Sequence, residues 1–424
     1  MGETEKTLVW PKEPSHRRNA ADETRTWPEE DYPKEEYPVW SILVLCYKNR
    51  ARLNGMLDSV FLQDYPRIRL VVSDDGSGDF DPAEVRDYID CGKRENIVER
   101  IVLKNDANLK TVRHVQKVLD YAGEYFVLTA ADDRFVSRSA ITEYNRTFKE
   151  NPASLWIVAR CNVLTPDYQR SIYLTPTPDD IPFFENSDPI RLYSRWCRRG
   201  MAIPCCMAFR KSALEAVGGI DDSYQYLEDW PLELKLCRSG YAPAYLPVVV
   251  AAHSTGGITN SNAAYGKDVR KAFFDDKARL FRQEVEPYLD LLTPEDLEAY
   301  RLYRAEIFDR NYFFDIDWEG SSRLQKLKLA LRSPKHFRWV AEQQYMKRQD
   351  RFERKKMLLV SQLLFLVSYF FLTPGYEGLL GGVFRFLGYV DFAAAAVLII
   401  LAIVSFPLEL SFRRLAEKRR RLVN

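Results

Sequence analysis

Short apolar runs alternate with amphipathic stretches over the first third of the chain. The apolar runs lie at 41–45, 70–72 and 125–128, and a further strand is predicted at 98–103. Runs of this length are typical of strands buried on both faces of a sheet. The stretches between them carry apolar side chains at helical spacing, as in Leu53, Met56, Leu57, Val60 and Phe61. This alternation predicts an α/β fold with a doubly wound, mostly parallel sheet.

The pattern is mixed between about residues 154 and 253. Strand-like runs lie at 155–158 and 248–252, and an amphipathic helix is predicted to begin at Asp229. Residues 266–318 predict helices that carry many aromatic side chains. We therefore expect a leader at 1–38 that is disordered or loosely packed, an α/β domain at 39–265, and a helical region at 266–356.

Two long uncharged segments follow, at 357–376 and 392–408. About 20 apolar residues span a bilayer, so 357–410 predicts a transmembrane hairpin, with a basic tail at 411–424. Lys and Arg flank the outer sides, which favours both ends in the cytoplasm and a multi-pass protein of the cytoplasmic membrane. The alternative is a buried hydrophobic hairpin in a soluble protein. Residues 321–356 hold 12 Lys and Arg against 3 acids, which suits anionic membrane lipid.

Composition narrows the classes of function. The 424 residues are 46% hydrophobic and 29% charged, as in globular proteins. The net charge of +1 argues against general nucleic-acid binding. Seven cysteines form no CxxC pair and the chain has only four histidines, so we expect reduced structural thiols rather than a zinc cluster.

The first candidate site is the acidic turn Asp74-Asp75-Gly76-Ser77-Gly78-Asp79, which follows a predicted strand. Ligands bind at the carboxyl ends of the strands in such sheets. Carboxylates there accept hydrogen bonds from a nucleobase and from ribose hydroxyls. The alternative is a plain Asp-Gly turn, the commonest use of that dipeptide.

A second pair, Asp132 and Asp133, follows the run at 125–128. Adjacent carboxylates form a hard oxygen site suited to Mg²⁺ or Mn²⁺, and such a cation neutralises a diphosphate leaving group. The alternative is a solvated pair that caps the next helix. His253, after another apolar run, is a candidate ligand for the metal or the diphosphate, although a lone histidine is more often structural.

The third cluster is Glu228-Asp229-Trp230, at the start of the predicted helix. Asp229 is a candidate general base, and the helix dipole favours its ionised form. A simple helix cap is the alternative. Glu228 and Trp230 are candidates for contacts with the substrate, since an indole ring can line a sugar site.

The order of these motifs resembles glycosyltransferase family 2. The matching residues are Tyr47, Asn49, Ser59, Gln63, the turn 74–79, the segment 123–133, the stretch 209–221, and Glu228 to Trp230. The resemblance covers about residues 40–255 and implies a GT-A fold, inverting transfer from a nucleoside-diphosphate sugar, and a divalent metal. Tyr47, Asn49, Asp74 and Asp75 would then bind the nucleotide, Asp132 and Asp133 the metal and ribose, and Asp229 would be the base.

Three departures from the family pattern stand out. Ala130 occupies the position of the first Asp of the DxD motif, and Lys110 stands where a glycine is common. The Gln-x-x-Arg-Trp motif of processive members is missing, which favours an enzyme that adds a single sugar.

The leading hypothesis is a membrane-anchored glycosyltransferase that adds one sugar from a nucleoside-diphosphate sugar, in particular a UDP-sugar, to a hydroxyl of a lipid-linked saccharide, as in bacterial surface-polysaccharide assembly. One alternative transfers the sugar to a polyisoprenyl phosphate, which needs no strong base. The other, motivated by Ala130, is a catalytically silent membrane scaffold that binds nucleotide-sugars.

Overall fold

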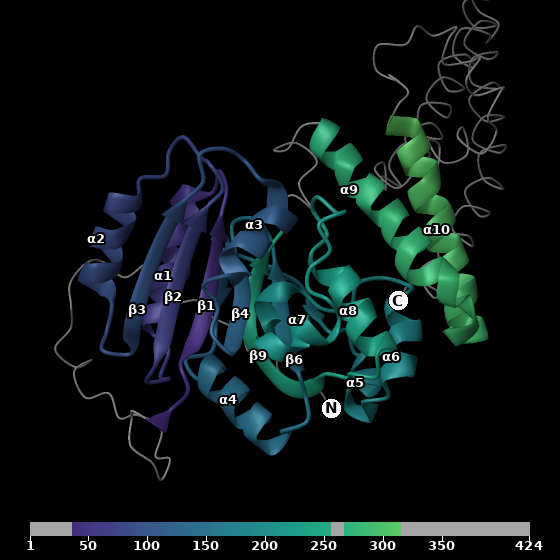
Figure 1. The fold of residues 1–424 in the computed structure, drawn as a ribbon, viewed down its shortest axis with the longest axis horizontal. Coiled ribbons are helices and arrows are strands. Elements are labelled where there is room, and N and C mark those ends of the chain that lie inside the picture. Colours follow the sequence, from purple (N-terminus) through teal and green to yellow (C-terminus); the bar gives the residue numbers. More distant parts are fainter. Residues whose placement is uncertain (1–35, 256–266, 315–424) are drawn as a thin grey trace, which may run out of the picture. The chain divides into compact units, whose positions relative to one another are not determined.

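The computed structural model describes residues 36–255 and 267–314 of the chain (Figure 1). The chain divides into two compact units, Met1–Leu292 and Thr293–Asn424. The predicted leader, basic segment and transmembrane hairpin lie outside the described residues. Within those residues, no helix combines the length and the apolar character needed to cross a membrane.

The first unit contains a mixed sheet whose strands follow the order β3-β2-β1-β4-β8-β6-β9-β5, with β7 paired to β6. The strands are β1 (Trp40–Cys46), β2 (Ile68–Asp74), β3 (Ile97–Lys104), β4 (Tyr125–Ala130), β5 (Asp133–Phe135), β6 (Trp156–Leu164), β7 (Ser171–Thr175), β8 (Met207–Arg210) and β9 (Ala244–Ser254). The α-helices are α1 (Arg50–Phe61), α2 (Pro82–Gly92), α3 (Lys110–Leu119), α4 (Ala140–Glu150), α5 (Ile181–Asn186), α6 (Pro189–Trp196), α7 (Lys211–Ala216), α8 (Asp229–Arg238), α9 (Lys267–Leu280) and α10 (Pro294–Phe314).

The sheet is parallel only in part. β3, β2, β1 and β4 are parallel neighbours, as predicted. In the second half, β8 runs antiparallel to β4 and to β6, and β5 antiparallel to β9. The expected mostly parallel sheet is therefore wrong for this half. A short loop at 165–170 joins β6 to β7, and a connection this short allows only an antiparallel pair.

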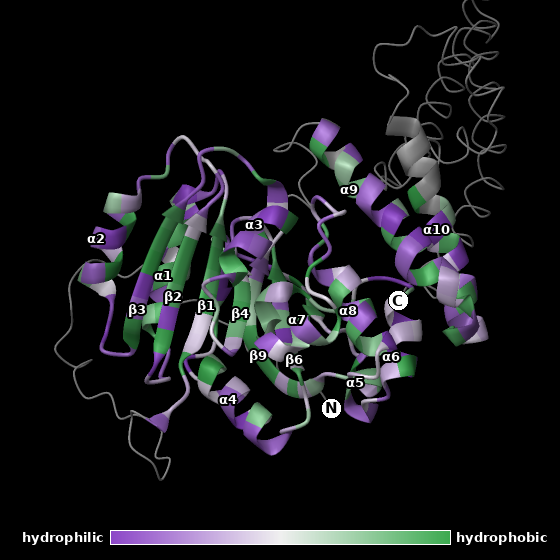
Figure 2. Cartoon of the chain, viewed as in Figure 1, coloured by the Kyte–Doolittle hydropathy of each residue, from purple (hydrophilic) through white to green (hydrophobic). Residues whose placement is uncertain are grey.

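Helices cover both faces of the sheet (Figure 1). Successive side chains of a strand point to opposite faces, so a central strand buries side chains on both faces. Ile42 and Val44 of β1 join one core with Leu53 and Leu57 of α1, while Leu43 is equally buried on the other side. The central strands are accordingly hydrophobic along most of their length (Figure 2). Burial on both faces is what the uninterrupted apolar runs predicted.

The Ser59 and Gln63 pair at the end of α1 has a structural role. The Ser59 hydroxyl donates to the carbonyl of Met56 (2.7 Å) and accepts from the amide of Phe135 (3.1 Å). Gln63 Nε2 donates to the carbonyls of Ser59 and Ser137. These bonds fix β5, and hence Asp133 at its start, against α1.

The predicted aromatic-rich helices are present at α9 and α10. The π-helix Phe281–Val285 and the 3-10 helix Glu286–Leu291 follow α9 and end the first unit. α9 therefore groups with the α/β domain, beyond the expected domain end at residue 265. In the second unit, Thr293 and Asp296 cap α10: the Thr293 hydroxyl donates to Asp296 Oδ2 (2.8 Å) and accepts from the Asp296 amide (3.2 Å).

Candidate functional site

Four strands end at one edge of the sheet and carry the predicted site residues there. β1, β2 and β4 are parallel neighbours, so their carboxyl ends coincide. β9 is parallel to β6, which runs in the same direction as β4. His253 near the end of β9 therefore lies at the same edge as Asp74 and Asp132, where ligands bind in open α/β sheets.

Asp74 and Asp75 are buried at the end of β2, at 0% and 3% exposure. Asp74 Oδ2 accepts from the amide of Ser77 at 2.6 Å. Asp75 Oδ1 accepts from Asn105 Nδ2 (2.9 Å) and from the amide of Leu109 (2.8 Å). Asp74 Oδ1 has no hydrogen-bond partner among the described residues. A buried carboxylate oxygen without a donor is costly, so this atom is suited to a donor group on a ligand.

The turn after these acids requires Gly76. Its φ is +80°, and a Cβ added there would lie 2.8 Å from the backbone carbonyl carbon of Ala107. The Asp-Gly turn of the alternative interpretation is thus present. It accounts for one oxygen of Asp74 and leaves the other available.

Asn49 connects the first two candidate clusters. Its Oδ1 accepts from the amide of Tyr47 (3.0 Å) and from the thiol of Cys46 (3.1 Å), and its Nδ2 donates to Asp132 Oδ1 (3.3 Å). Burial, followed by the nearby charge of Asp74, raises the pKa of the Cys46 thiol. Asn49 therefore orients Asp132, and its predicted contact with the nucleotide would be an additional role.

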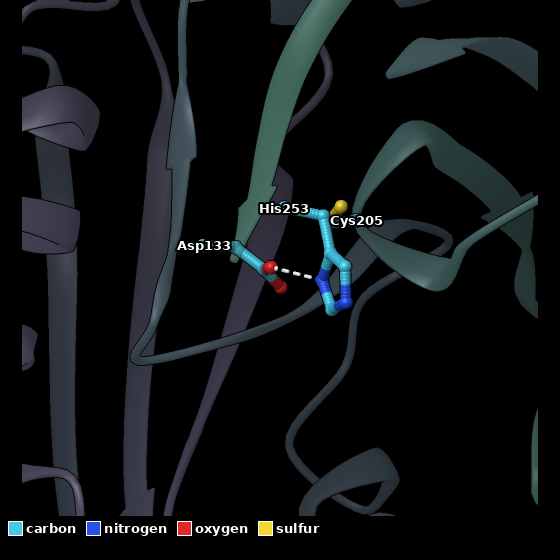
Figure 3. Close-up of side chains that lie close together, drawn as sticks. All are labelled: Asp133, Cys205 and His253. Carbon is cyan, nitrogen blue, oxygen red and sulfur yellow. Dashed lines mark hydrogen bonds and ion pairs between the residues drawn. The ribbon is translucent and has the colours of Figure 1, made fainter. Parts of the chain in front are cut away.

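Asp133 is held from two sides. Its Oδ2 accepts from the amide of Ala130 (2.9 Å) and the hydroxyl of Thr129 (3.2 Å), and its Oδ1 lies 2.8 Å from His253 Nδ1 (Figure 3). The backbones of Asp133 and His253 are paired opposite each other in β5 and β9. Ala130, which departs from the family pattern, thus supports Asp133 through its amide. Burial, followed by the charge of Asp133, raises the pKa of Asp132.

Cys205 completes a candidate metal group with Asp133 and His253 (Figure 3). One ligand atom from each residue lies within 4.8 Å of those of the other two. Burial alone lowers the pKa of His253, but its hydrogen bond to Asp133, together with Cys205, raises that pKa well above its usual range. The donors suit a divalent cation. Two of the three predicted ligands are in this group, and Asp132 is not.

Sequence reasoning treated Cys205 as a structural thiol. Its place beside Asp133 and His253 depends on the packing of the 3-10 helix Pro204–Cys206 against β4, β6 and β9, and no sequence motif signals that contact.

Two cationic side chains flank the same site. The Tyr168 hydroxyl donates to the carbonyl of Asp132 at 2.7 Å. The guanidinium groups of Arg134 and Arg52 lie 4.3 and 5.2 Å from the centre of the Tyr168 ring. The sequence did not reveal these three residues, because Tyr168 reaches the two arginines only through the folded position of the loop between β6 and β7. They supply positive charge next to Asp132.

Asp229 and Glu228 open α8 and are partly exposed. Asp229 Oδ1 accepts from the amide of Trp230 at 2.7 Å. Burial raises the pKa of both acids, and the backbone hydrogen bonds and Lys277 oppose that rise at Asp229. Burial thus acts against the ionised form that the helix dipole was expected to favour. A raised pKa suits a base that must hold a proton transiently.

The two acids border a small cavity. Its other lining residues are apolar and include Leu128 near the carboxyl end of β4 and Leu232 of α8. Asp229 therefore lies on the side of the sheet that Phe126 and Leu128 of β4 face.

Trp230 points into the protein and is only 5% exposed. Its indole N–H donates to the carbonyl of Trp196 (3.1 Å), and its ring packs edge-on against Phe281. This geometry argues against the predicted contact with a sugar. The physical reason is that the apolar ring gains more from burial between α6 and the π-helix than a surface position would give.

The loop before α8 connects the base to the nucleotide side. The amide of Val112, in the first turn of α3, donates to the carbonyl of Gln225 at 3.1 Å. Asp276 Oδ2 of α9 accepts from the amides of Gln225 (2.8 Å) and Tyr226 (2.6 Å). Burial, followed by the neighbouring Tyr47, raises the pKa of Tyr226. Tyr226 and Asp276 are further site residues that the sequence did not reveal.

Lys110 adopts a conformation that normally favours glycine. Its φ is +67°, and its amide donates to Asn108 Oδ1 at 2.7 Å. Its ammonium group also donates to Gln225 Oε1. The positive φ explains why glycine is common at this position in the family. Lysine adopts the same backbone conformation here at a cost in free energy of about 1–2 kcal/mol.

Comparison with protein families identifies the domain. Residues 41–218 match the family described as Glycosyl transferase family 2. This range includes Asp74, Asp75, Asp132, Asp133 and Cys205, and ends before Asp229 and His253. These residues are thus similar to a family 2 glycosyltransferase domain, and the predicted enzyme class, a glycosyltransferase, is confirmed. Curated proteins gave no significant sequence match.

Several solved structures are similar to this chain. TarS from S. aureus is 14% identical, with a TM-score of 0.43, over 66% of this chain and 55% of the TarS chain. TarS 1–349 in complex with UDP is also 14% identical, with a TM-score of 0.42, over 68% of this chain and 93% of that chain. The mannosyltransferase PcManGT from Pyrobaculum calidifontis, in complex with GDP-Man and Mn²⁺, is 15% identical, with a TM-score of 0.44, over 88% and 90%.

Proposed function

We propose that this glycosyltransferase inverts the anomeric centre and moves one sugar from a nucleoside-diphosphate sugar, in particular a UDP-sugar, to a hydroxyl of a lipid-linked saccharide. The reaction would take place at the cytoplasmic face of the membrane. The observation that carries the proposal is the convergence of two acid pairs at one edge of the sheet, Asp74 with Asp75 and Asp132 with Asp133. Glu228 and Asp229 border a cavity that side chains of β4 also line.

The nucleoside would bind at the end of β2. Asp74 Oδ1 is buried and without a partner among the described residues, so it can accept from an N–H of the base or a ribose hydroxyl. Tyr47 and Tyr226 lie near Asp75 and offer aromatic surface beside it.

The diphosphate would lie between the metal group and the two arginines. Asp133 and His253 would hold a divalent cation, which when bound neutralises charge on the leaving diphosphate. Arg52 and Arg134 beside Tyr168 add fixed positive charge on the same side. Preorganised charge of this kind stabilises the transition state more than the ground state.

Asp229 would be the general base. Its carboxylate takes the proton from the acceptor hydroxyl while the hydroxyl oxygen forms a bond to the anomeric carbon. The bond from that carbon to the diphosphate oxygen breaks on the opposite face, so the configuration inverts. Burial raises the pKa of Asp229, so its carboxylate is a stronger base than an exposed one.

The lipid-linked acceptor and the location at the membrane are supported by the sequence of the C-terminal region. The uncharged segments 357–376 and 392–408 and the basic segment 321–356 would hold the catalytic domain at the cytoplasmic leaflet. The absence of the Gln-x-x-Arg-Trp motif supports addition of a single sugar.

Asp229→Asn in the full-length protein provides the test. With UDP- and GDP-sugar donors and a saccharide-lipid acceptor, we expect transfer at saturating donor to fall by at least about 10²-fold, while donor affinity stays within about twofold of the parent. Glu228→Gln should cost less. Asp222→Asn, an exposed acid in the preceding loop, is the matched control and should transfer normally.

The same assay decides between the acceptors. If Asp229→Asn transfers at the parental rate to a polyisoprenyl phosphate, the hydroxyl acceptor is refuted, because a phosphate needs no base. Inversion is checked by the anomeric configuration of the product in NMR spectra.

A further inference from the structure

We infer that the cation site of this chain is a thiolate site, in which Cys205 binds the metal directly beside Asp133 and His253. The site should then prefer a borderline cation such as Zn²⁺ or Co²⁺ over Mg²⁺. This inference rests on the proposed metal site and adds to it the third ligand and the class of metal.

Three separate elements bring the ligands together. Asp133 and His253 face each other across the antiparallel pair β5 and β9, which fixes the spacing of their backbones. Cys205 comes from the 3-10 helix Pro204–Cys206, and its side chain is 1% exposed. The candidate ligand atoms of the three residues lie within 4.8 Å of one another. A metal ion needs only a small contraction of this group to reach bonding distances of about 2.0–2.3 Å.

A second thiol lies behind Cys205. The Sγ atoms of Cys161, on β6, and Cys205 are 3.8 Å apart, and both residues are buried. Their separation places a second soft donor near the metal group. The thiol of Cys206 donates to the carbonyl of Ile203 at 3.1 Å, and Cys206 is not in the metal group.

The hydroxyl of Tyr144 is the independent observation. Tyr144 is fully buried, and its hydroxyl has no hydrogen-bond partner among the described residues. Burial, followed by the neighbouring thiols of Cys206, Cys205 and Cys161, raises the pKa of this hydroxyl. A buried hydroxyl without a partner is costly, whereas a metal-bound thiolate is a strong acceptor beside it. Tyr144 is therefore suited to support a thiolate.

The mixture of donors decides the metal class. Carboxylate and water oxygens suit Mg²⁺ and Mn²⁺, whereas thiolate and imidazole favour Zn²⁺ and Co²⁺. One carboxylate, one imidazole and one thiolate leave further positions open for diphosphate oxygens. Binding releases the thiol proton of Cys205 to solvent, and the sulfur then bonds to the metal as a thiolate.

The test is a titration of the tag-free full-length protein with Co²⁺. A cobalt-bound thiolate absorbs in the near ultraviolet through charge transfer from sulfur, which carboxylate and imidazole ligands do not produce. We expect this band in the parent. Cys205→Ser should abolish it and weaken Co²⁺ binding by at least about tenfold, while Mg²⁺ affinity changes by less than about twofold.

Two control variants make the result specific. Cys91→Ser removes the exposed cysteine and should leave the band and the Co²⁺ affinity unchanged. Cys161→Ser should keep the band, because Cys161 is not in the metal group. If Cys205→Ser unfolds, Cys205→Ala in the same titration provides the second measurement, with near-ultraviolet circular dichroism to establish that it is folded.

The outcomes separate this inference from the proposed function. A missing band in the parent, or a band that persists in Cys205→Ser, overturns the thiolate ligand even if sugar transfer is normal. A band lost only in Cys161→Ser assigns the thiolate to Cys161 and also overturns it. A band that depends on Cys205 in a protein without transferase activity supports the thiolate site and refutes the proposed function instead.

Discussion

At the scale of single residues, Glu233 shows how burial sets the response to pH. It lies one turn after Asp229 on α8, is 1% exposed, and its Oε1 has no hydrogen-bond partner among the described residues. Burial, followed by the charge of Asp229, raises its pKa well above the usual range. The folded protein therefore keeps this proton at pH values where the unfolded chain has released it.

The free energy of unfolding should consequently fall as the pH rises above about 4.3, the ordinary pKa of a glutamate. The fall should continue up to the raised pKa of Glu233, with a slope of up to about 1.4 kcal/mol per pH unit. Glu233→Gln removes the titration, so we expect a flatter pH dependence and a higher melting temperature at neutral pH. Glu215→Gln, an exposed glutamate of α7, is the control and should follow the parent. A Glu233→Gln curve parallel to the parent's would contradict the assignment.

Gly76 allows a sharper test at the same scale. Gly76→Ala meets both a left-handed φ and the backbone of Ala107 at 2.8 Å, so we expect a loss of stability of about 1–3 kcal/mol and weaker nucleotide binding. Gly78→Ala, two residues later in the same turn, has open space around it and should stay within about 0.5 kcal/mol of the parent. Thermal unfolding with and without UDP measures both. Equal behaviour of the two variants would refute the account.

The residues that could be predicted are those whose partners are near in sequence. Asp74, Asp75, Asp132 and Asp133 directly follow apolar runs, and the end of a strand is where a sheet exposes its carboxyl edge. Cys205 and Tyr168 reach the site only through contacts with residues at least 34 positions away, such as the bond from Tyr168 to Asp132. No local pattern records such a contact.

At the scale of elements, α9 holds the loop that carries the base. Asp276 accepts from two amides of that loop and is 1% exposed, whereas its neighbour Asp275 is 41% exposed in an ion pair with Lys271. A buried hydrogen bond to a charged acceptor contributes about 1.5–3 kcal/mol. Asp276→Ala should therefore lower the transfer rate by about tenfold or more.

Asp275→Ala is the matched control and should leave transfer unchanged, because exposed ion pairs contribute little. Hydrogen exchange gives a second measurement: the amides of Gln225 and Tyr226 should lose protection in Asp276→Ala and keep it in Asp275→Ala. Unchanged protection in both variants would show that α9 does not position the loop.

Elements themselves were largely predictable where one pattern dominated. The strands β1 to β4 and the helices between them match the apolar runs and the helical spacing. The direction of the later strands was not predictable, because β6 and β8 are neighbours in the sheet but are separated in the sequence by β7, α5 and α6. The side chain of Trp230 was not predictable either. Its position at the start of a helix suggested an exposed indole ring, whereas the ring is buried against Phe281, which lies 51 residues further along the chain.

At the scale of the whole molecule, the α/β domain and the predicted membrane anchor are governed by different physical rules. The central strands of the first unit are buried on both faces, and Asp74, Asp75, Asp132 and Asp133 lie at one edge of the sheet. The predicted anchor comprises the two uncharged segments at 357–376 and 392–408. Run length and flanking charge predict a hairpin there, and the association of the chain with a membrane is open to direct measurement.

Chains ending at residues 356 and 320 provide that measurement, because they differ only by the segment with 12 Lys and Arg against 3 acids. Each basic side chain near an anionic surface contributes about 1 kcal/mol, and salt screens the attraction over about 10 Å at 0.1 M. The longer chain should sediment with vesicles that contain phosphatidylserine at low salt and be released at high salt, whereas the shorter chain should stay in solution. The full-length protein, with its two uncharged segments, should remain in the membrane after alkaline washing. Equal binding by the two truncated chains would contradict the role of the basic segment, and release of the full-length protein by alkali would contradict the hairpin.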